Sequence, residues 1–344
     1  MLLLLVPLPL VIAANAAVGK RWAGHAIGIL AGVTAGITFL VGALDLAGAG
    51  LVQAGAGGQP QGLDVGIMIT AVVAATLASR PVRERVARAI PIDPDNPVHA
   101  YALVLAVILF GSQLATLVFV DVLAVDQSLP PLTISDLAAS QAPFLIMALA
   151  GVGLYIRRTT AGAAVRLGLV RPAWWQVPVA FAAAGAFFAF IQAADALSHA
   201  WTPDIASHVD KTTQHVFGGL ENPAGIAALA VLPGLCEEIL FRGALQPRIG
   251  LLATAVLFAS IHTQYGFSFD ALSVLVVAVG LGLVRKYTNT TTSCVCHVSY
   301  NLLAAIGIAG ALMGVAIAVE AGLLAISGYA LWLNLSRRRV PATP

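Results

Sequence analysis

Long apolar runs follow one another along the whole chain, and short polar segments separate them. The runs are continuous rather than alternating in polarity, so each predicts a helix and not a strand of a transmembrane barrel. About 20 apolar residues cross a bilayer as a helix, and many runs approach or exceed that length. We expect helices near residues 2–18, 24–52, 64–79, 98–125, 141–156, 175–197, 223–242, 250–264, 269–285, 294–317 and 320–336.

The composition fits a membrane protein. Hydrophobic residues make up 59% of the chain and charged residues 10%, whereas soluble domains are about 25% charged. The mean hydropathy is +0.91. We therefore expect an all-α fold, a polytopic membrane protein of about eleven transmembrane helices surrounded by membrane lipids. Nothing in the composition points to a nucleic-acid partner.

Basic residues follow every second apolar run, and the loops between, such as 55–62 and 126–136, nearly lack them. This alternation predicts an N-terminus outside and a C-terminus in the cytoplasm. An excess of arginine over lysine in an Ala/Gly-rich chain indicates a GC-rich bacterial genome, so we expect a bacterial plasma membrane. The basic positions are Lys20, Arg21, Arg80, Arg83, Arg85, Arg88, Arg157, Arg158, Arg242, Arg248, Arg285, Lys286 and Arg337 to Arg339.

The N-terminal run and the cysteines allow two interpretations each. The run 1–16 has no basic residues before it, so we interpret it as a first transmembrane helix rather than a cleaved signal peptide.

Cys236, Cys294 and Cys296 do not form a secreted disulfide framework. They lie beside acidic or histidine residues, where thiolate ligation is one interpretation and small apolar core residues the other.

Two polar segments interrupt the apolar pattern. Residues 80–97 begin as a basic, interfacial helix and end in Pro/Asp turns, a pattern typical of contact with anionic headgroups. Residues 198–222 form the longest polar loop. A surface metal site is one interpretation of that loop, but the spacing of its histidines fits no compact ligand motif. Its candidate ligands are His199, Asp204, His208, Asp210 and His215.

The deeply placed polar residues divide the chain into parts. Residues 1–172 predict transmembrane helices of unknown role. Residues 173–318 contain the intramembrane groups with chemistry, and we expect the site there. Residues 319–344 predict a final transmembrane helix and a basic cytoplasmic tail.

Adjacent glutamates, Glu237 and Glu238, lie inside the apolar run 227–245. Each ionised carboxylate costs about 2.5–3.5 kcal/mol at membrane depth, so the pair needs an offsetting interaction. Arg242 stands four residues after Glu238, in the favourable order for an ion pair within a helix. Glu237 has no such partner, and an unpaired, poorly hydrated carboxylate is suited to accept a proton. Pro233 comes one turn earlier and frees a backbone carbonyl, as in helices that line polar cavities.

Two further polar groups occupy the following apolar runs. His262 follows Phe258 by four residues, and Asn301 follows His297 by the same interval. An ion pair alone is consistent with a structural lock between helices, and a His/Asn pair alone with interhelical hydrogen bonding. Three such groups on neighbouring helices instead favour one polar site around water or a metal.

The segments 237–243, 258–262 and 297–301 resemble the three motifs of the CAAX-protease and bacteriocin-processing family of intramembrane proteases. These motifs are Glu-Glu-x-x-x-Arg, Phe-x-x-x-His and His-x-x-x-Asn, in this order. The resemblance covers roughly residues 175–318. It implies a CAAX-type intramembrane endopeptidase, a metalloprotease, whose catalytic helix bundle occupies the C-terminal half.

The resemblance also implies roles for the motif residues. Glu237 would activate the attacking water, and His262 would hold that water or a metal. His297 would stabilise the oxyanion together with Asn301, or would be a second metal ligand beside His262. Glu238 and Arg242 would fix the helix. Zn²⁺ is the expected ion, while the absence of a His-Glu-x-x-His motif leaves a metal-free mechanism open.

Competing interpretations come from other classes of protein. A proton-coupled transporter would also place Glu, His and Arg in the membrane, but no inverted repeat is visible in the sequence. A non-catalytic membrane scaffold or immunity protein would not require every motif position to be intact. For a protease, the expected partner is a hydrophobic or lipid-modified peptide or protein.

Overall fold

The computed structural model describes residues 5–51, 60–308 and 312–339. The structure is 81% helical, and the described residues contain no strands, which confirms the all-α fold class. Some expectations lie partly outside the described residues: the beginning of the 2–18 helix, the end of the 24–52 helix, most of the 55–62 loop, the middle of the 294–317 helix and the last five residues.

In the described residues, each of the eleven expected helices corresponds to one helix of the structure, and five further helices, α4, α6, α8, α10 and α12, add to them. A π-helical segment, Ile239–Leu245, joins α11 to α12. The helices are α1 Leu8–Ala17, α2 Ala23–Leu46, α3 Gln61–Thr76, α4 Arg80–Val86, α5 Pro97–Phe119, α6 Val122–Ser128, α7 Ile134–Val152, α8 Thr160–Leu167, α9 Gln176–Trp201, α10 Pro203–Phe217, α11 Pro223–Glu238, α12 Gln246–Ile249, α13 Leu251–Ser260, α14 Phe269–Tyr287, α15 Thr290–Ile306 and α16 Leu312–Arg339.

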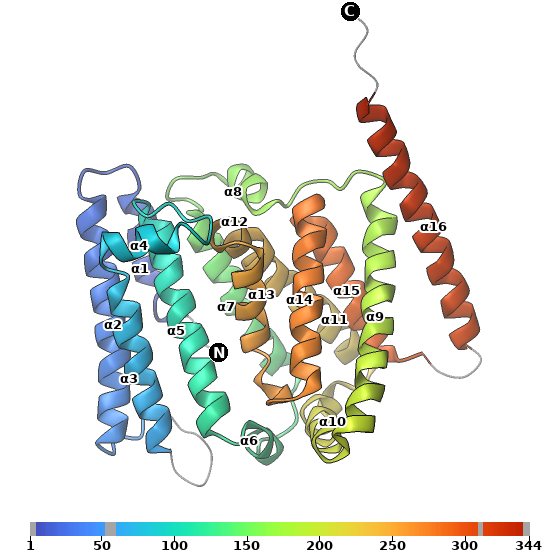
Figure 1. Cartoon of the computed structure of the whole chain (residues 1–344), viewed down its shortest axis with the longest axis horizontal. Coiled ribbons are helices and arrows are strands. Elements are labelled where there is room, and N and C mark those ends of the chain that lie inside the picture. The colour runs from blue at the N-terminus through green and yellow to red at the C-terminus, as the bar shows by residue number, and fades with distance from the viewer. Residues whose placement is uncertain (1–4, 52–59, 309–311, 340–344) are drawn as a thin grey trace, which may run out of the picture.

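The long helices stand side by side and run alternately in opposite directions (Figure 1). Six spans are long and apolar enough to cross a membrane, namely α2, α5, α7, α9, Pro223–Ile249 and Leu312–Leu333. The α3–α4 pair, bent by 95°, makes a seventh if it counts as one span. The protein is therefore a polytopic membrane protein. Among the described residues the number of such spans is nevertheless below eleven. Helices α1 and α13 have only ten residues each and α15 has 17, while α14 is long enough but carries Asp270, Arg285 and Lys286 at its ends.

Short helices cover both ends of the bundle. The basic helices α4, α8 and α12 lie at one end, and α6 and α10 lie at the other (Figure 1). The arginines of these short helices lie at one end of the bundle, which agrees with the alternation of basic and non-basic loops along the sequence. Which end faces the cytoplasm remains a prediction.

The two polar segments have more helix than their composition suggests. Residues 80–97 contain α4 and a turn, as expected. Residues 198–222, which we expected to be a loop, contain the 15-residue helix α10. Ala206, Val209 and Thr212 recur every three residues and are buried, so this helix is amphipathic and packs on α9 and α6.

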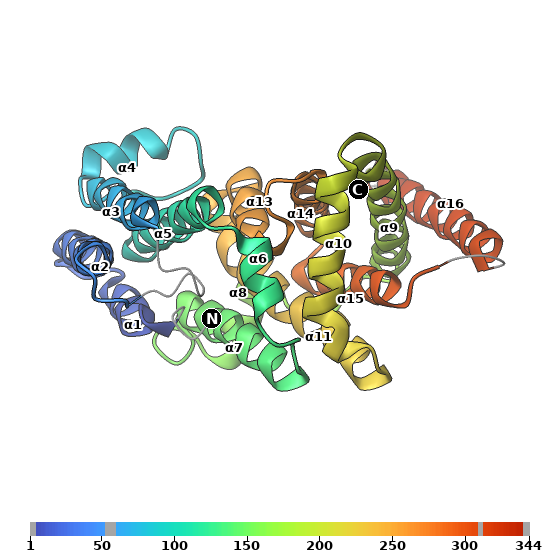
Figure 2. The same ribbon diagram turned by 90° about the horizontal axis from the view of Figure 1, so that it is seen from below.

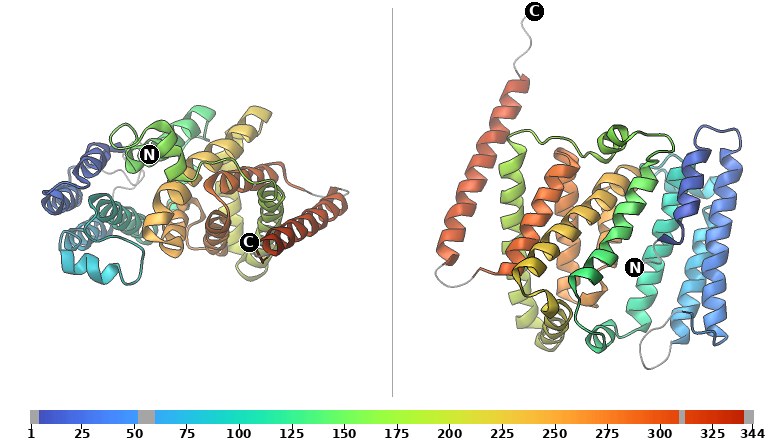
Figure 3. Two further views of the ribbon diagram at one scale, coloured as in Figure 1. Left: turned by 90° about the horizontal axis from the view of Figure 1, so that it is seen from above. Right: turned by 180° about the vertical axis from the view of Figure 1, so that it is seen from behind.

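The middle of the bundle is formed by α7, α11 and α13 (Figure 2). On one side α2 packs against α3 and α3 against α5; on the other, α15 packs against α9, and α16 lies outermost (Figure 3). The largest apolar cluster joins α1, α2 and α5 to α13 and α14 and contains Phe241 and Phe258.

Contacts cross the expected boundary between residues 172 and 173. Helix α7, from the N-terminal part, packs against α11 and the π segment. The division into parts stays a prediction, but α7 belongs to the surroundings of the expected site.

Close packing of α11 on α15 depends on Gly234. A Cβ atom at this position would lie 2.6 Å from Val298 Cγ2 and 2.9 Å from the Val298 backbone nitrogen. Backbone cannot move aside as a flexible side chain can, so we expect Gly234→Ala to separate the two helices and to lower stability by about 1–3 kcal/mol.

Thermal unfolding in detergent measures this loss. Gly28→Ala in α2 is the matched control, because a Cβ atom there meets nothing within 4 Å. Equal stability of the two variants would contradict the assigned importance of the α11–α15 contact.

Candidate active site

Glu238 is the centre of a buried polar network. Its carboxylate is completely buried, and Oε2 lies 3.6 Å from Arg242 Nε. His297 Nδ1 is 3.2 Å from Oε1, and the Ser293 hydroxyl donates to Oε2. The ion pair expected from the sequence is therefore present, and α15 supplies two further partners. A carboxylate with this many partners is suited to structure rather than to proton transfer.

Arg242 connects this network to two other helices. Its side chain is completely buried, and Nη2 donates to the Ala278 carbonyl of α14 at 3.2 Å. The guanidinium carbon lies 4.6 Å from the centre of the Phe258 ring, a cation–π distance. Gln246, one helical turn later, donates to the Gly282 carbonyl at 2.8 Å. The side chains of Arg242 and Gln246 thus hold the π segment and the start of α12 against α14.

Glu237 has a different environment. The side chain is buried, with 5% of its surface exposed. Its Oε1 accepts a hydrogen bond of 3.1 Å from Gln141 of α7. Its Oε2 is buried and has no hydrogen-bond partner among the described residues. Of the two glutamates, Glu237 therefore retains an oxygen that is free to interact with another molecule.

The two histidines lie against the same aromatic ring. The Phe258 ring centre is 4.7 Å from that of His262 and 6.0 Å from that of His297. His262 follows the end of α13 rather than lying inside a helix to residue 264, as we had expected. Its Nδ1 is 2.9 Å from the Phe258 carbonyl oxygen. His262 is also within electrostatic range of Glu237 and His297.

Asn301 links α15 to α11. Its Nδ2 lies 3.5 Å from the Leu229 carbonyl oxygen, a long hydrogen bond. Leu229 is the residue four before Pro233, so its carbonyl is the one that the proline leaves without a backbone donor. The backbone carbonyl that we expected Pro233 to free is thus the acceptor of the Asn301 side chain. All six expected site residues lie in or beside one region of the bundle.

The residues offer ligand atoms of the kinds that zinc prefers. Both histidines use Nδ1 in a hydrogen bond, as metal-bound histidines do, and their Nε2 atoms have no bond to other described residues. Glu237 Oε2 is the third available atom. Among the described residues, however, these three side chains do not bring their ligand atoms within 4.8 Å of one another. The donors fit zinc in kind, and binding would require them to approach.

Outside this region, one group in the described chain does bring three ligand atoms within 4.8 Å: Asp195, His199 and Asp210. His199 Nε2 lies 3.0 Å from Asp210 and 3.7 Å from Asp195. His208 is exposed, and His215 instead bonds the Leu129 carbonyl at 2.7 Å. Only two of the five candidate ligands in the 198–222 segment therefore come together.

Two residues of the site were not anticipated. Gln141 lies at the edge of an expected apolar helix, where a lone amide is a weak signal of a buried polar contact. Ser293 is four residues before His297 and shares its helix face, so the same spacing rule would have found it.

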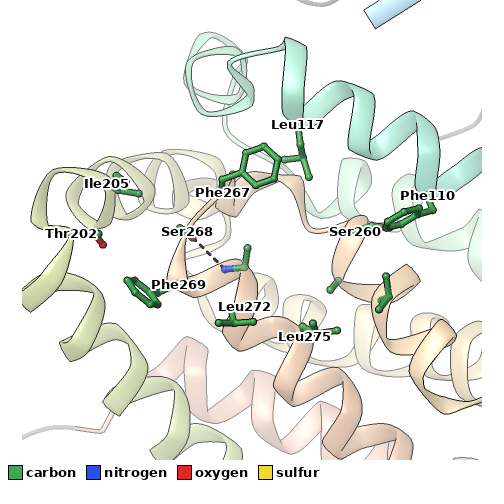
Figure 4. A pocket seen from close by; sticks show the side chains of 14 residues that line it. Phe110, Leu117, Thr202, Ile205, Ser260, Phe267, Ser268, Phe269, Leu272 and Leu275 are labelled. Atoms are coloured by element: carbon green, nitrogen blue, oxygen red, sulfur yellow. Dashed lines mark hydrogen bonds between the residues drawn. The ribbon is translucent and has the colours of Figure 1, made fainter. Parts of the chain in front are cut away.

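An apolar groove lies beside α13, with a volume of about 490 Å³ (Figure 4). Val256, Ala259 and Ser260 line it, and they occupy the opposite side of α13 from Phe258. Its other walls come from α5, α14 and the junction of α9 with α10, including Phe110, Phe267 and Leu272. The groove thus reaches the loop that follows His262 without joining the catalytic groups directly.

Comparison with known proteins relates the expected motifs to a family. Residues 220–303 match the family model described as type II CAAX prenyl endopeptidase Rce1-like. These residues, about a quarter of the chain, are similar to that family. The match contains all six expected site residues and confirms the resemblance seen in the sequence. Gln141 lies outside the matched residues.

A curated protein also resembles part of the chain. The uncharacterized protein YpbD of Bacillus subtilis (strain 168) is 39% identical over 66 residues, which cover 19% of this chain. The matched part spans 34% of YpbD, about a third of that protein. No solved structure matches the chain.

The network around Glu238 predicts a large effect of Arg242→Ala. This change leaves Glu238 buried without a cation and removes the contact with Phe258. Breaking a buried ion pair costs about 3–5 kcal/mol, so we expect a marked fall in the unfolding temperature in detergent.

Arg80→Ala is the matched control. Arg80 also pairs with two carboxylates, but its side chain is 61% exposed, and exposed ion pairs contribute little to stability. Similar unfolding temperatures for the two variants would contradict a structural role for the buried pair.

Proposed function

We propose that the protein is an intramembrane endopeptidase that hydrolyses a peptide bond of a hydrophobic or membrane-associated substrate. The observation that carries the proposal is the different environment of the two glutamates. Glu238 holds the cation and the imidazole, while Glu237 keeps one buried oxygen without a partner. The similarity of residues 220–303 to the Rce1-like family supports the same class of reaction.

The first step is activation of water. A water molecule beside Glu237 Oε2 and His262 gives a proton to the Glu237 carboxylate as its oxygen attacks the substrate carbonyl. Gln141 holds the other oxygen of Glu237 and so fixes the direction of the free one. Glu237 then gives the proton to the leaving amine, the C–N bond breaks, and the products are a carboxylic acid and an amine.

The second requirement is stabilisation of the oxyanion. His297 and Asn301 lie one turn apart on α15, and each carries an N–H group. His297 Nδ1 donates to the Glu238 carboxylate, which fixes the ring. In the imidazolium form, which the same carboxylate stabilises, Nε2 also carries a proton and donates to the oxyanion. The Asn301 amide makes only a long bond to Leu229, so it exchanges this partner for an oxyanion at little cost.

For a metal-dependent reaction, His262, His297 and Glu237 would hold Zn²⁺. When bound, Zn²⁺ supplies a Lewis acid that polarises the substrate carbonyl and lowers the pKa of bound water. The tests below therefore include the metal content of each variant.

The apolar groove beside α13 supports a hydrophobic substrate. Its lining is almost entirely aliphatic and aromatic, and it leads to the loop after His262 (Figure 4). A volume of about 490 Å³ is within the usual range of ligand pockets. We propose that an apolar part of the substrate lies there while its peptide bond reaches Glu237.

The variant Glu237→Gln tests the assignment of the base. The amide keeps its shape and can still accept the bond from Gln141, but it cannot take a proton. We expect hydrolysis of a membrane peptide by purified protein to fall by about 10²–10⁴-fold while the unfolding temperature stays unchanged.

The control for this variant is Glu221→Gln, an exposed glutamate just before α11, which should retain full hydrolysis. Zinc measured in the wild type and absent from His262→Ala would support metal dependence. A folded wild type that hydrolyses no membrane peptide would contradict the proposed function and favour a transporter or a scaffold.

A second variant, Gln141→Leu, tests the positioning of Glu237. Hydrogen bonds to charged groups contribute about 1.5–3 kcal/mol, so we expect kcat to fall about tenfold or more with KM unchanged. Gln141 Oε1 is buried without a partner, so leucine also removes an unsatisfied acceptor and stability should change little. A loss of stability that matches the loss of activity would instead assign Gln141 a purely structural role.

A further inference from the structure

Five arginines lie in or next to the helix ends on the side of the bundle that carries α8 and α12, the two helices that Figure 1 labels there. Arg157 and Arg158 follow α7, Arg166 lies in the last turn of α8, Arg248 lies in α12, and Arg285 lies in the last turns of α14. We call this set the arginine cluster. None of its members belongs to the proposed catalytic machinery, and the inference below does not depend on proteolysis.

The arginine cluster has no carboxylate to balance its charge. In the described chain, none of its members forms an ion pair with an aspartate or glutamate, whereas nearby Arg80 pairs with Glu84 and Asp95. The charged groups that act on Arg166 are Arg158 and Arg285. Burial, followed by these like charges, lowers the pKa of Arg166. The cluster therefore repels itself unless an anion joins it.

The hydrogen bonds of the arginine cluster go to neutral acceptors. Arg157 Nε donates to the Asn15 side chain at 2.8 Å, and Arg248 Nη2 donates to the Gly151 carbonyl at 3.2 Å. These bonds orient the guanidinium groups without neutralising them. Arg248 Nε and Arg285 Nε are buried and have no partner among the described residues. Arg248 itself is only 3% exposed, and a buried, unbalanced charge is costly.

A hollow of about 460 Å³ opens beside the arginine cluster. Arg157 and Arg158 are the members of the arginine cluster that line it, together with Tyr155, Ile156, Thr159 and Thr160. Tyr155, also in its wall, has a φ of 58°, in the left-handed region, and is 81% exposed. The chain thus turns sharply here, and the wall of this open hollow combines arginine and threonine side chains with Ile156 and the Tyr155 ring.

Exposed apolar residues also occur in α8 and in the segment between α8 and α9. Val165 is 68% exposed and Trp174 is 60% exposed. Together with Tyr155, these side chains are typical of the interface between headgroups and acyl chains, where aromatic residues with one polar end are enriched. A free anion would need only the arginines, whereas a lipid would use both kinds of surface.

We propose that the arginine cluster binds the phosphate of an anionic phospholipid headgroup. The phosphate balances the guanidinium groups, the threonine hydroxyls bond its oxygens, and the acyl chains lie against the neighbouring apolar side chains. Because α12 continues into the π segment that contains Arg242, the bound lipid also holds the end of the span that carries the two glutamates.

The test uses the full chain in nanodiscs of phosphatidylcholine with or without phosphatidylglycerol. Arg166→Gln is the best variant, because Arg166 has no hydrogen bond to another described residue and its loss should leave the fold intact. We expect native mass spectrometry to find phosphatidylglycerol bound about fivefold more weakly to Arg166→Gln than to the wild type. Charge reversal in Arg166→Glu should weaken it further.

Arg80→Gln is the matched control, since it removes one arginine that already has carboxylate partners at the same end of the bundle. It should bind phosphatidylglycerol as the wild type does. Equal weakening in Arg80→Gln and Arg166→Gln would overturn the proposal and assign binding to the general charge of this end. Stabilisation of the wild type by inorganic phosphate, with no effect of phosphatidylglycerol, would overturn the lipid assignment in favour of a free anion.

Discussion

The completely buried pair of Glu238 and Arg242 is the interaction on which the rest of the site depends. Removing two charges from water costs several kcal/mol for each, and their attraction alone offsets this only when further hydrogen bonds complete both groups. Here the additional partners come from α14 and α15: Ser293 and His297 bond Glu238, and the Ala278 carbonyl accepts from Arg242 Nη2, while Arg242 Nε and Nη1 have no hydrogen-bond partner among the described residues. One electrostatic requirement therefore fixes four segments relative to one another, and the neighbouring Glu237 is positioned as a consequence.

Local spacing explains why much of the site could be predicted from the sequence. Glu238 and Arg242, Phe258 and His262, and His297 and Asn301 are each four residues apart, so each pair is set by the geometry of a single turn. The contact of Gln141 with Glu237 joins residues 96 positions apart, and no periodicity within one helix contains that information. The distances between the candidate zinc ligands Glu237, His262 and His297 also depend on how three segments approach one another, which a single sequence does not specify.

The fold was predictable in the same uneven way. Continuous apolar runs gave every long helix, because burial in lipid requires a helix wherever such a run occurs. Helix α10 was missed because its apolar side is made of alanine, valine and threonine, which hardly raise the hydropathy of a polar segment. The end of α13 was placed too late, since residues 261–264 have a composition that a helix would also accept, and tertiary packing decides the boundary.

The π segment after Glu238 constrains how the chain can change in length. A π-bulge is a single helical turn with i→i+5 hydrogen bonds. Because it contains one extra residue, the side chains that follow it are rotated about the helix axis by about 100° relative to a regular α-helix. Gln246 reaches Gly282 only in this shifted phase while Glu238 still faces α15. Deleting one residue between Ile239 and Leu245 would restore a regular α-helix. Either Gln246 would then rotate away from Gly282, or Glu238 would rotate away from α15. Insertions and deletions within Ile239–Leu245 are therefore not tolerable.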